Sequence, residues 1–372
     1  MSGYRVIDCD GHVAEPWEAY RDYADPEFRD RVPRRVDVEG HRFVVVDGTV
    51  YPNFVKYGGR PLGIAGPTKE FARPVQKQDL SEGGVDPHRR IKDMDLDGIE
   101  VAVCYPSGAG SMCAVPDPGL ETALYRSYNR WLADYCAPYV ARIKGVAVVS
   151  LRDVQRGVEE LERTAREPWM VGLLCPPHMD RMNLDHPSLY PLWAACQDLD
   201  VPLCIHAGCG RPPYALGTEE SSENLFMMHA MAHPFEQMRA MAALMGGGVL
   251  DLFPKLRVGF LESGVGWVPW WLDRLEEHAE KLPGHVPLMK HEPMEYVMRG
   301  QCYFSCEVDE PMLAPVAAQI GHDKVLYASD YPHWDCSFPG STTALAERTD
   351  LDEEAKRSIL GANALRLYTR IG

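Results

Sequence analysis

Residues 201–206 read VPLCIH, and this short stretch decides the fold class. It is apolar up to its last residue, which is a side chain that can bind a metal. A near-continuous apolar run of this length is typical of a strand buried on both faces, as in a parallel sheet. Seven similar runs flank it: VIDCD (6–10), IEVAVCYP (99–106), IKGVAVVSL (143–151), MVGLLC (170–175), LRVGFLE (256–262), CYFSCE (302–307) and KVLYASD (324–330).

Amphipathic stretches separate most of these runs and predict helices. Eight strand–helix units favour an α/β fold, the closed (β/α)₈ TIM barrel. An open, doubly wound sheet is the alternative, but no G-x-G-x-x-G motif follows the first strand. The 372 residues fit a single barrel domain, 1–372. Helices are expected at 120–137, 154–166, 187–199, 224–253, 268–281, 311–320 and 351–368.

The segment 17–97 interrupts the alternation. It contains HRFVVVDGTVYP (41–52), two β-rich runs joined at Asp47-Gly48, which predicts a hairpin. The Gly- and Pro-rich stretch YGGRPLGIAGP (57–67) follows. We expect an insertion after strand one that forms a lid over the mouth of the barrel.

The charge and the cysteines limit the kinds of partner and compartment. Lys and Arg number 38 and Asp and Glu 54, which gives a net charge of −16. Such a surface repels nucleic acid and anionic membranes, so neither is expected as a partner. We find no leader pattern and no apolar run long enough to span a membrane. The eleven cysteines form no C-x-x-C pair, and this pattern predicts a cytoplasmic protein.

Metal-ligand residue types gather where the predicted strands end. Asp10 and His12 lie in or after the first strand, and His206, Glu262 and Asp330 end three later ones. Because the active site of a TIM barrel lies at the carboxyl ends of its strands, these side chains predict a metal centre. Among them we expect Glu262 and Asp330 to take part in catalysis.

Further candidates lie close by in the sequence. Glu15 and His233 complete the predicted ligand set, and His233 is also a candidate catalytic group. His229 precedes His233 by four residues, so both face one side of a helix. His178, His229 and His333 are candidates for contact with the substrate.

Five motifs resemble the amidohydrolase superfamily, in the branch related to aminocarboxymuconate-semialdehyde decarboxylase. They are VIDCDGHVAEP (6–16), VPLCIHAG (201–208), FPKLRVGFLESGVGW (253–267), VLYASDYPHWD (325–335) and GANALRLY (361–368). The resemblance implies that His12, His206 and Asp330 bind metal. Asp10 stands where the family usually has the first His of an H-x-H pair. Glu262 replaces a His that decarboxylases of the family use.

Two enzyme hypotheses follow. The mixed carboxylate and imidazole set suits iron or manganese and is large enough for two ions. The chain also resembles the TIM-barrel non-haem di-iron monooxygenases of diterpenoid antibiotic biosynthesis. The first hypothesis is therefore a two-iron, O₂-dependent monooxygenase that hydroxylates a bulky apolar substrate, terpenoid or linked to acyl-CoA. It needs an external electron donor, and the resemblance suggests a homodimer. Methionines in the predicted helix 224–253 would line the substrate site.

The alternative is a hydrolase or non-oxidative decarboxylase that uses zinc or manganese. A binding module without catalysis would leave the clustered ligand types unexplained.

Overall fold

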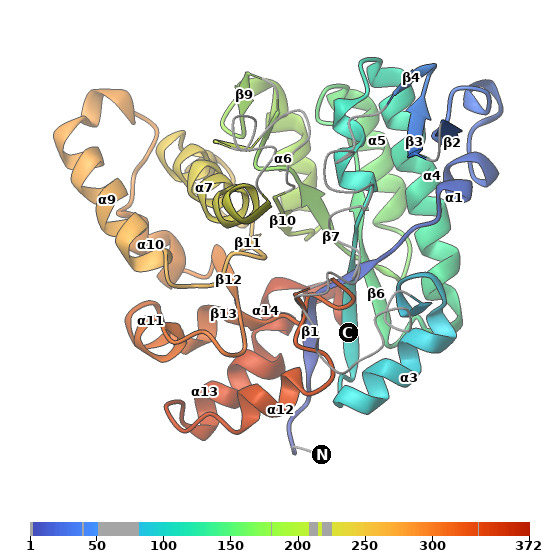
Figure 1. Cartoon of the computed structure of the whole chain (residues 1–372). Coiled ribbons are helices and arrows are strands. Elements are labelled where there is room, and N and C mark those ends of the chain that lie inside the picture. The colour runs from blue at the N-terminus through green and yellow to red at the C-terminus, as the bar shows by residue number, and fades with distance from the viewer. Residues whose placement is uncertain are drawn as a thin grey trace.

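Eight parallel strands form one sheet, and their order in the sheet is their order in the sequence (Figure 1). This is a computed structural model, which describes residues 3–38, 41–50, 82–179, 181–207, 215–217, 225–333 and 335–372. The strands are β1 Ile7–Val13, β5 Val101–Pro106, β6 Ile143–Val148, β7 Met170–Cys175, β10 Leu203–Ile205, β11 Val258–Phe260, β12 Cys302–Cys306 and β13 Val325–Tyr327. Each of the eight predicted strands is present.

The sheet closes where the first strand meets the chain that follows the last. The N–H of Asp330 donates to the carbonyl of Asp10 over 2.8 Å, and the N–H of His12 donates to the carbonyl of Tyr331 over 2.6 Å. Strand order would reverse in a doubly wound sheet. The predicted (β/α)₈ TIM barrel is therefore confirmed, and the alternative is excluded.

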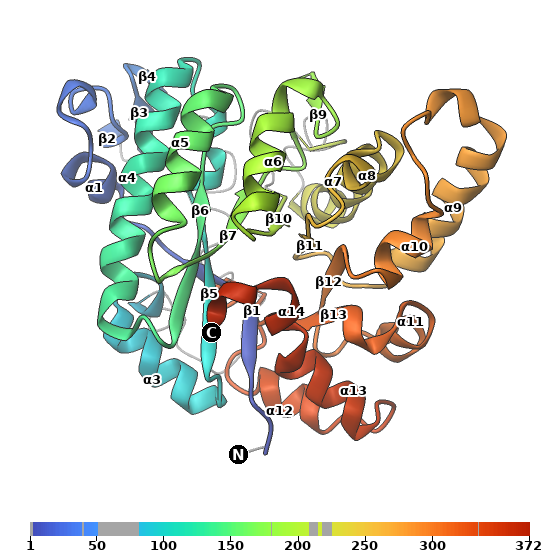
Figure 2. The ribbon, with the colours of Figure 1, turned by 180° about the vertical axis from the view of Figure 1, so that it is seen from behind.

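Helices surround the sheet on its outer side in both views (Figures 1 and 2). Several begin at an Asp whose carboxylate accepts a backbone N–H in the first turn, as Asp86 and Asp117 do. The helices are α1 Trp17–Asp22, α3 Pro87–Asp97, α4 Pro118–Cys136, α5 Val154–Thr164, α6 Tyr190–Asp198, α7 Leu225–Gly246, α8 Val249–Leu252, α9 Val268–Lys281, α10 Pro293–Met298, α11 Leu313–Ile320, α12 Ser341–Ala346, α13 Glu353–Arg357 and α14 Ala364–Leu367.

The last predicted helix, 351–368, is not continuous. A π-helical turn over Ser358–Ala362 separates α13 from α14. Gly361 lies in this turn, and a Cβ atom there would stand 2.2 Å from the carbonyl oxygen of Arg5. The close approach of the turn to the chain that enters β1 thus explains the break.

The insertion after β1 is partly described. Strands β2 (Arg34–Val38), β3 (His41–Val46) and β4 (Thr49–Val50) form a small antiparallel sheet. The predicted hairpin at Asp47-Gly48 is confirmed, since both residues have positive φ, 50° and 77°. The Gly- and Pro-rich stretch lies outside the described residues. The segment 17–97 also contains α3, which follows the insertion and leads into β5; the lid role stays a prediction.

Candidate metal centre

Asp10, His12, His206 and Asp330 lie together at the carboxyl ends of three strands. Asp10 and His12 belong to β1, His206 directly follows β10, and Asp330 follows β13. His12 Nε2 lies 3.4 Å from Asp10 Oδ1, 3.4 Å from Asp330 Oδ1 and 3.2 Å from His206 Nε2. We call these four residues the first donor group.

A bulge in β1 helps to aim its two donors. Asp8 pairs with Ala102 of β5 and Gly11 pairs with Cys104, so β1 has one extra residue at this point. A bulge bends a strand and redirects its side chains. Gly11 is needed there, because a Cβ atom would lie 2.8 Å from Asp8 Oδ2.

The first donor group fits a divalent metal ion. Asp10 is 1% exposed, and neither of its carboxylate oxygens accepts a hydrogen bond from the described residues. Burial therefore raises the pKa of Asp10 well above its usual range. Donor atoms of a tetrahedral site with bonds of about 2.1 Å lie about 3.4 Å apart. The donor atoms of Asp10, His12 and His206 lie 3.2–3.7 Å from one another, close to that value. A cation would compensate the buried charge.

His206 is oriented for ligation through Nε2. Its Nδ1 lies 2.9 Å from the carbonyl oxygen of Ala207, which leaves Nε2 facing the other donors. Burial lowers the pKa of His206, but the carboxylates of Glu262 and Asp10 outweigh that effect and raise it to about 9. A metal that binds here must therefore displace a proton.

Glu262 lies between the first donor group and helix α7. Its Oε2 is 2.9 Å from His206 Nε2 and 3.6 Å from His233 Nδ1. Burial raises the pKa of Glu262, but His233 and His206 outweigh it and hold that pKa well below its usual range. Glu262 has φ 54°, as does Asp330. A left-handed backbone at non-glycine residues is uncommon and often marks a functional site.

The two histidines of α7 form a further cluster with Glu262. His229 and His233 stand one turn apart, with ring centroids separated by 4.7 Å. One ligand atom from each of His229, His233 and Glu262 lies within 4.8 Å of the others. His229 and His233 therefore lie on one side of a helix, as predicted.

His333 also lies at the centre. Its Nδ1 is 2.6 Å from Asp330 Oδ1, and its Nε2 is 3.3 Å from Ser107 Oγ. Its ring lies against that of His12, with 3.8 Å between centroids and 31° between the ring planes. Burial lowers the pKa of His333 to about 4, so this ring is neutral at pH 7.

Two predicted site residues have other partners. Glu15 Oε1 accepts a hydrogen bond from the N–H of Gly108 over 2.7 Å, and Glu15 Oε2 accepts one from Ser107 over 3.2 Å. Glu15 therefore holds the loop after β5 and lies outside the ligand clusters. His178 Nε2 lies 2.9 Å from Glu236 Oε2 of α7, in a separate buried pair.

Sequence reasoning missed the groups that support β1. Arg90 of α3 is buried and donates to the carbonyl of His12 over 2.7 Å. Asp8 accepts hydrogen bonds from the N–H of Ser329 over 2.9 Å and from its hydroxyl over 2.6 Å. Asp8 could have been found, since it is an acidic residue inside a buried strand. No local pattern marks Arg90.

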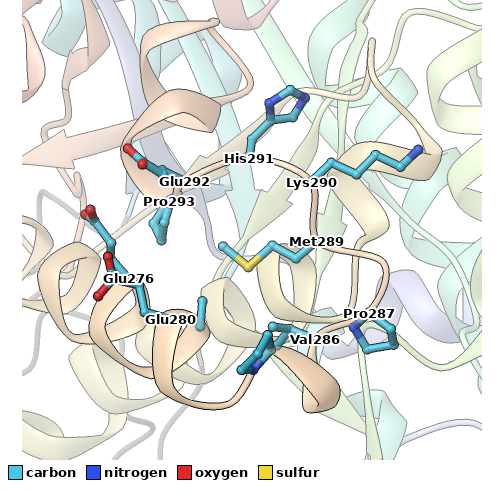
Figure 3. Close-up of a pocket in the computed structure, with 11 residues that line it drawn as sticks. Glu276, Glu280, Val286, Pro287, Met289, Lys290, His291, Glu292 and Pro293 are labelled. Atoms are coloured by element: carbon cyan, nitrogen blue, oxygen red, sulfur yellow. The ribbon is translucent and has the colours of Figure 1, made fainter.

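A separate pocket lies on the outer surface, between α9 and α10 (Figure 3). Its volume is about 350 Å³, and Glu276, Met289 and His291 are among its lining residues. None of the predicted site residues lines it, so it is distinct from the metal centre.

A sequence profile of the family described as amidohydrolase matches residues 7–370. The chain belongs to this family. It is 26% identical over 285 residues to a 2-amino-3-carboxymuconate-6-semialdehyde decarboxylase of Dictyostelium discoideum, covering 75% of this chain and 76% of the relative. It is 24% identical over 297 residues to a gamma-resorcylate decarboxylase of a Polaromonas species, covering 75% and 86%.

Solved amidohydrolase structures share the barrel. One from Mycobacterium avium subsp. paratuberculosis has a TM-score of 0.80 and 24% identity, with both chains covered completely. A dihydroxybenzoic acid decarboxylase from Polaromonas has a TM-score of 0.71 and 20% identity, covering 98% of this chain and 97% of that one. That structure holds manganese and the inhibitor 2-nitroresorcinol. At these identities the likeness shows the fold alone.

The relatives overturn the first functional hypothesis. The relatives matched by sequence are decarboxylases, so the prediction of a di-iron monooxygenase and oxidoreductase of antibiotic biosynthesis is wrong. Iron, dioxygen and an external electron donor are not supported, and two solved decarboxylase structures contain manganese. The error has a physical cause: carboxylates and imidazoles are ligands for both metals, so the residue types did not discriminate between them.

The methionines of α7 were expected to contact the substrate. Three of them, Met228, Met241 and Met245, are buried. The solved relatives bind small aromatic molecules, which are unlike the large apolar or CoA-linked substrate expected.

Among the described helices, none is both long and apolar enough to cross a membrane. The homodimer stays a prediction.

Proposed function

We propose that the protein is a metal-dependent, non-oxidative decarboxylase of small aromatic carboxylic acids. The observation that carries the proposal is the first donor group, a buried and convergent set of two carboxylates and two imidazoles. We propose that Asp10, His12, His206 and Asp330 hold one divalent ion, with manganese favoured because solved relatives contain it. The named reactions of the curated relatives support decarboxylation.

The reaction breaks the bond between the substrate carbon and its carboxylate. The electron pair stays on that carbon, CO₂ leaves, and the carbon takes up one proton. No electrons leave the substrate, so neither dioxygen nor a reductant is consumed. When bound, the metal supplies Lewis-acid polarisation of the substrate's oxygen atoms.

Proton delivery is assigned to Asp330 and His333. Their close contact of 2.6 Å joins the first donor group to His333, whose Nε2 faces the hydroxyl of Ser107. A proton can therefore move between these three groups along hydrogen-bonding distances. His333 is neutral at pH 7, so its unprotonated ring nitrogen can accept a proton that Asp330 carries and then return it.

By the family resemblance, Glu262 stands where decarboxylases of the family have a histidine. Other imidazole rings nevertheless lie close to its carboxylate. His233 and His333 lie 3.6 and 3.9 Å from its carboxylate oxygens. We propose that Glu262 orients these rings and His206 through its charge. We propose that Glu15 contributes by holding the loop after β5 in place. We propose that His178 lies outside the reacting centre.

The experiment that tests this function uses the full chain loaded with Mn²⁺ under anaerobic conditions. The substrates are 2,6-dihydroxybenzoate, 5-carboxyvanillate and other hydroxylated benzoates, and CO₂ release is measured. We expect turnover without oxygen, and in D₂O we expect one deuterium on the carbon that lost CO₂. An Asp10→Ala variant serves as the inactive control. Absence of CO₂ release from the whole panel, with metal bound and the fold intact, would overturn the proposal.

A further inference from the structure

Two buried tyrosines link the C-terminal segment of the chain to the metal centre. Tyr105 belongs to β5, Tyr368 directly follows α14, and both side chains are fully buried. Their hydroxyl oxygens lie 2.5 Å apart, and the hydroxyl of Tyr368 donates to the carbonyl oxygen of Cys9 over 3.0 Å. A tyrosine hydroxyl has one hydrogen, and Tyr368 uses its hydrogen on the carbonyl, so Tyr105 donates to Tyr368. The hydrogen bonds therefore run in one direction, from β5 through Tyr368 to β1.

The carbonyl of Cys9 lies in the bulge of β1. The pairing between β1 and β5 shifts register between Asp8 and Gly11, so Cys9 and Asp10 are the residues at the irregularity. A bulge interrupts the ladder, and its backbone groups need other partners. The hydroxyl of Tyr368 is such a partner, and it binds one residue before Asp10. It therefore stabilises the backbone from which the carboxylate of Asp10 projects.

The ring of Tyr105 supports two candidate ligands. It lies against the ring of His206, with 5.5 Å between centroids and 29° between the ring planes. The ring of His12 lies 6.0 Å away and is tilted by 44°. An imidazole can turn about its Cβ–Cγ bond, and a flat neighbour that is held in place limits this rotation. The orientation of both imidazoles thus depends on how firmly Tyr105 is held.

The segment that carries Tyr368 is itself fixed to the barrel. It is the motif GANALRLY (361–368), and its helix α14 lies beside β1 in both views (Figures 1 and 2). The side-chain amide of Asn363 is fully buried and donates to the carbonyls of His322 and Val325, over 2.8 and 2.7 Å. These bonds tie the motif to the start of β13. The hydroxyl of Tyr368 is therefore presented to the barrel from a rigid base.

We propose that Tyr368 is a positioning residue for the metal centre. Its hydroxyl acts on Asp10 through the backbone of β1. It acts on His12 and His206 through the ring of Tyr105. The inference rests on the proposed metal site but not on the proposed reaction, because Mn²⁺ binding is measured without a substrate. A side chain near the end of the chain thus sets the geometry of three ligands.

The test compares the full chain with Tyr368→Phe, which removes one oxygen atom and keeps the ring. Mn²⁺ affinity is measured by calorimetry on chelator-treated protein, and electron paramagnetic resonance of bound Mn²⁺ reports the symmetry of its ligands. We expect the affinity to fall about 10-fold, because contacts that orient metal ligands typically contribute about that much. We also expect a changed zero-field splitting. An unchanged affinity together with an unchanged spectrum would overturn the proposal.

A second substitution tests whether the two tyrosines act together. Tyr105→Phe breaks the same hydrogen bond from the other side, and it serves in place of Tyr368→Phe if that variant does not fold. Because both hydroxyls act along one series of bonds, the double variant should weaken Mn²⁺ binding by less than the product of the two separate factors. Independent effects that multiply fully would contradict the coupling.

Tyr296→Phe is the matched control. It removes a fully buried hydroxyl that donates to Asp251 over 2.5 Å, in α10 on the outer side of the barrel. We expect it to lower the thermal unfolding temperature about as much as Tyr368→Phe does, while Mn²⁺ affinity stays unchanged. Equal losses of Mn²⁺ affinity in both variants would show that Tyr368 acts only through general stability, against the proposal.

Nuclear magnetic resonance of the metal-free chain separates this inference from the proposed function. With ring-labelled histidine, the signals of His12 and His206 are assigned from the variants His12→Gln and His206→Gln. We expect Tyr368→Phe to shift both signals, because the aromatic ring of Tyr105 acts on them. Unchanged signals would refute the inference even in a chain that binds Mn²⁺. Shifted signals in a chain that binds no Mn²⁺ would support the positioning of the rings and overturn the proposed metal site instead.

Discussion

The backbone N–H of Asp330 donates a hydrogen bond of 2.8 Å to the carbonyl oxygen of Asp10. Two candidate metal ligands are thus joined through their main chains as well as through the centre that their side chains face. The same pair of residues closes the barrel between the first and last strands. The geometry of the metal centre and the closure of the fold therefore depend on one another.

Removing a first-group carboxylate should remove metal and activity together. For Asp330→Asn we expect Mn²⁺ binding at the first donor group to weaken and CO₂ release to fall by about 100-fold or more, because a charged donor and a proton carrier are both lost. Metal analysis and single-turnover assays check this. A variant that keeps full activity would contradict both roles. Asp309→Asn, a substitution outside the donor group, is the matched control.

Arg90 should stabilise the metal-bearing end of β1. Arg90→Met leaves the carbonyl of His12 without this donor and removes a positive charge that acts on Asp8. We expect a loss of about 2–3 kcal/mol in the free energy of unfolding, measured by chemical denaturation. Arg274→Met on α9, where the side chain is half exposed, should change stability by less than about 0.5 kcal/mol. Equal effects for the two variants would refute the assignment.

A substitution of Glu15 distinguishes a role in holding the loop after β5 from a role as a metal ligand. Glu15→Ala removes the acceptor for the N–H groups of Ser107 and Gly108, so we expect a loss of about 1–3 kcal/mol in stability. We expect the manganese content to stay unchanged, because Glu15 lies outside the ligand clusters. Elemental analysis combined with thermal unfolding measures both quantities. A variant that loses an ion would show instead that Glu15 binds metal.

The stability of the metal-free protein should depend on His206. Burial lowers its pKa, but Glu262 and Asp10 raise it to about 9, above the value of about 6.5 in an unfolded chain. The protonated ring therefore contributes stability that is fully present below about pH 6.5 and is lost as the pH rises through about 9.

Denaturation of the metal-free chain between about pH 6.5 and 9 tests this dependence, and His206→Gln should make the stability flatter over that range. In the same range Mn²⁺ should bind more tightly as pH rises, since the metal no longer competes with the proton. A Mn²⁺ affinity independent of pH would contradict the shifted pKa of His206.

The order of the strands and the ends that carry Asp10, His206 and Asp330 were predictable because both follow from local patterns. Apolar runs identify buried parallel strands, and a TIM barrel brings their carboxyl ends together. The actual partners of Glu15 and Arg90 were not predictable. Glu15 contacts a loop 93 residues further along the chain, and Arg90 contacts a carbonyl 78 residues away.

The residue types alone also did not identify the metal or the reaction. The carboxylates and imidazoles around His12 suit iron and manganese alike. The family resemblance implied that Glu262 stands in the place of a histidine, but not that His233 and His333 approach the same point from other elements. Such convergence depends on tertiary structure.

The bond between Ser329 and Asp8 joins residues 321 positions apart. Once β1 has been synthesised, the nascent chain contains two of the four residues of the first donor group. The last of them, Asp330, is added only after β13 has been synthesised. A nascent chain therefore carries an incomplete centre through most of its synthesis. It can acquire its full affinity for metal only when the last strand docks, so metal loading reports completion of the barrel.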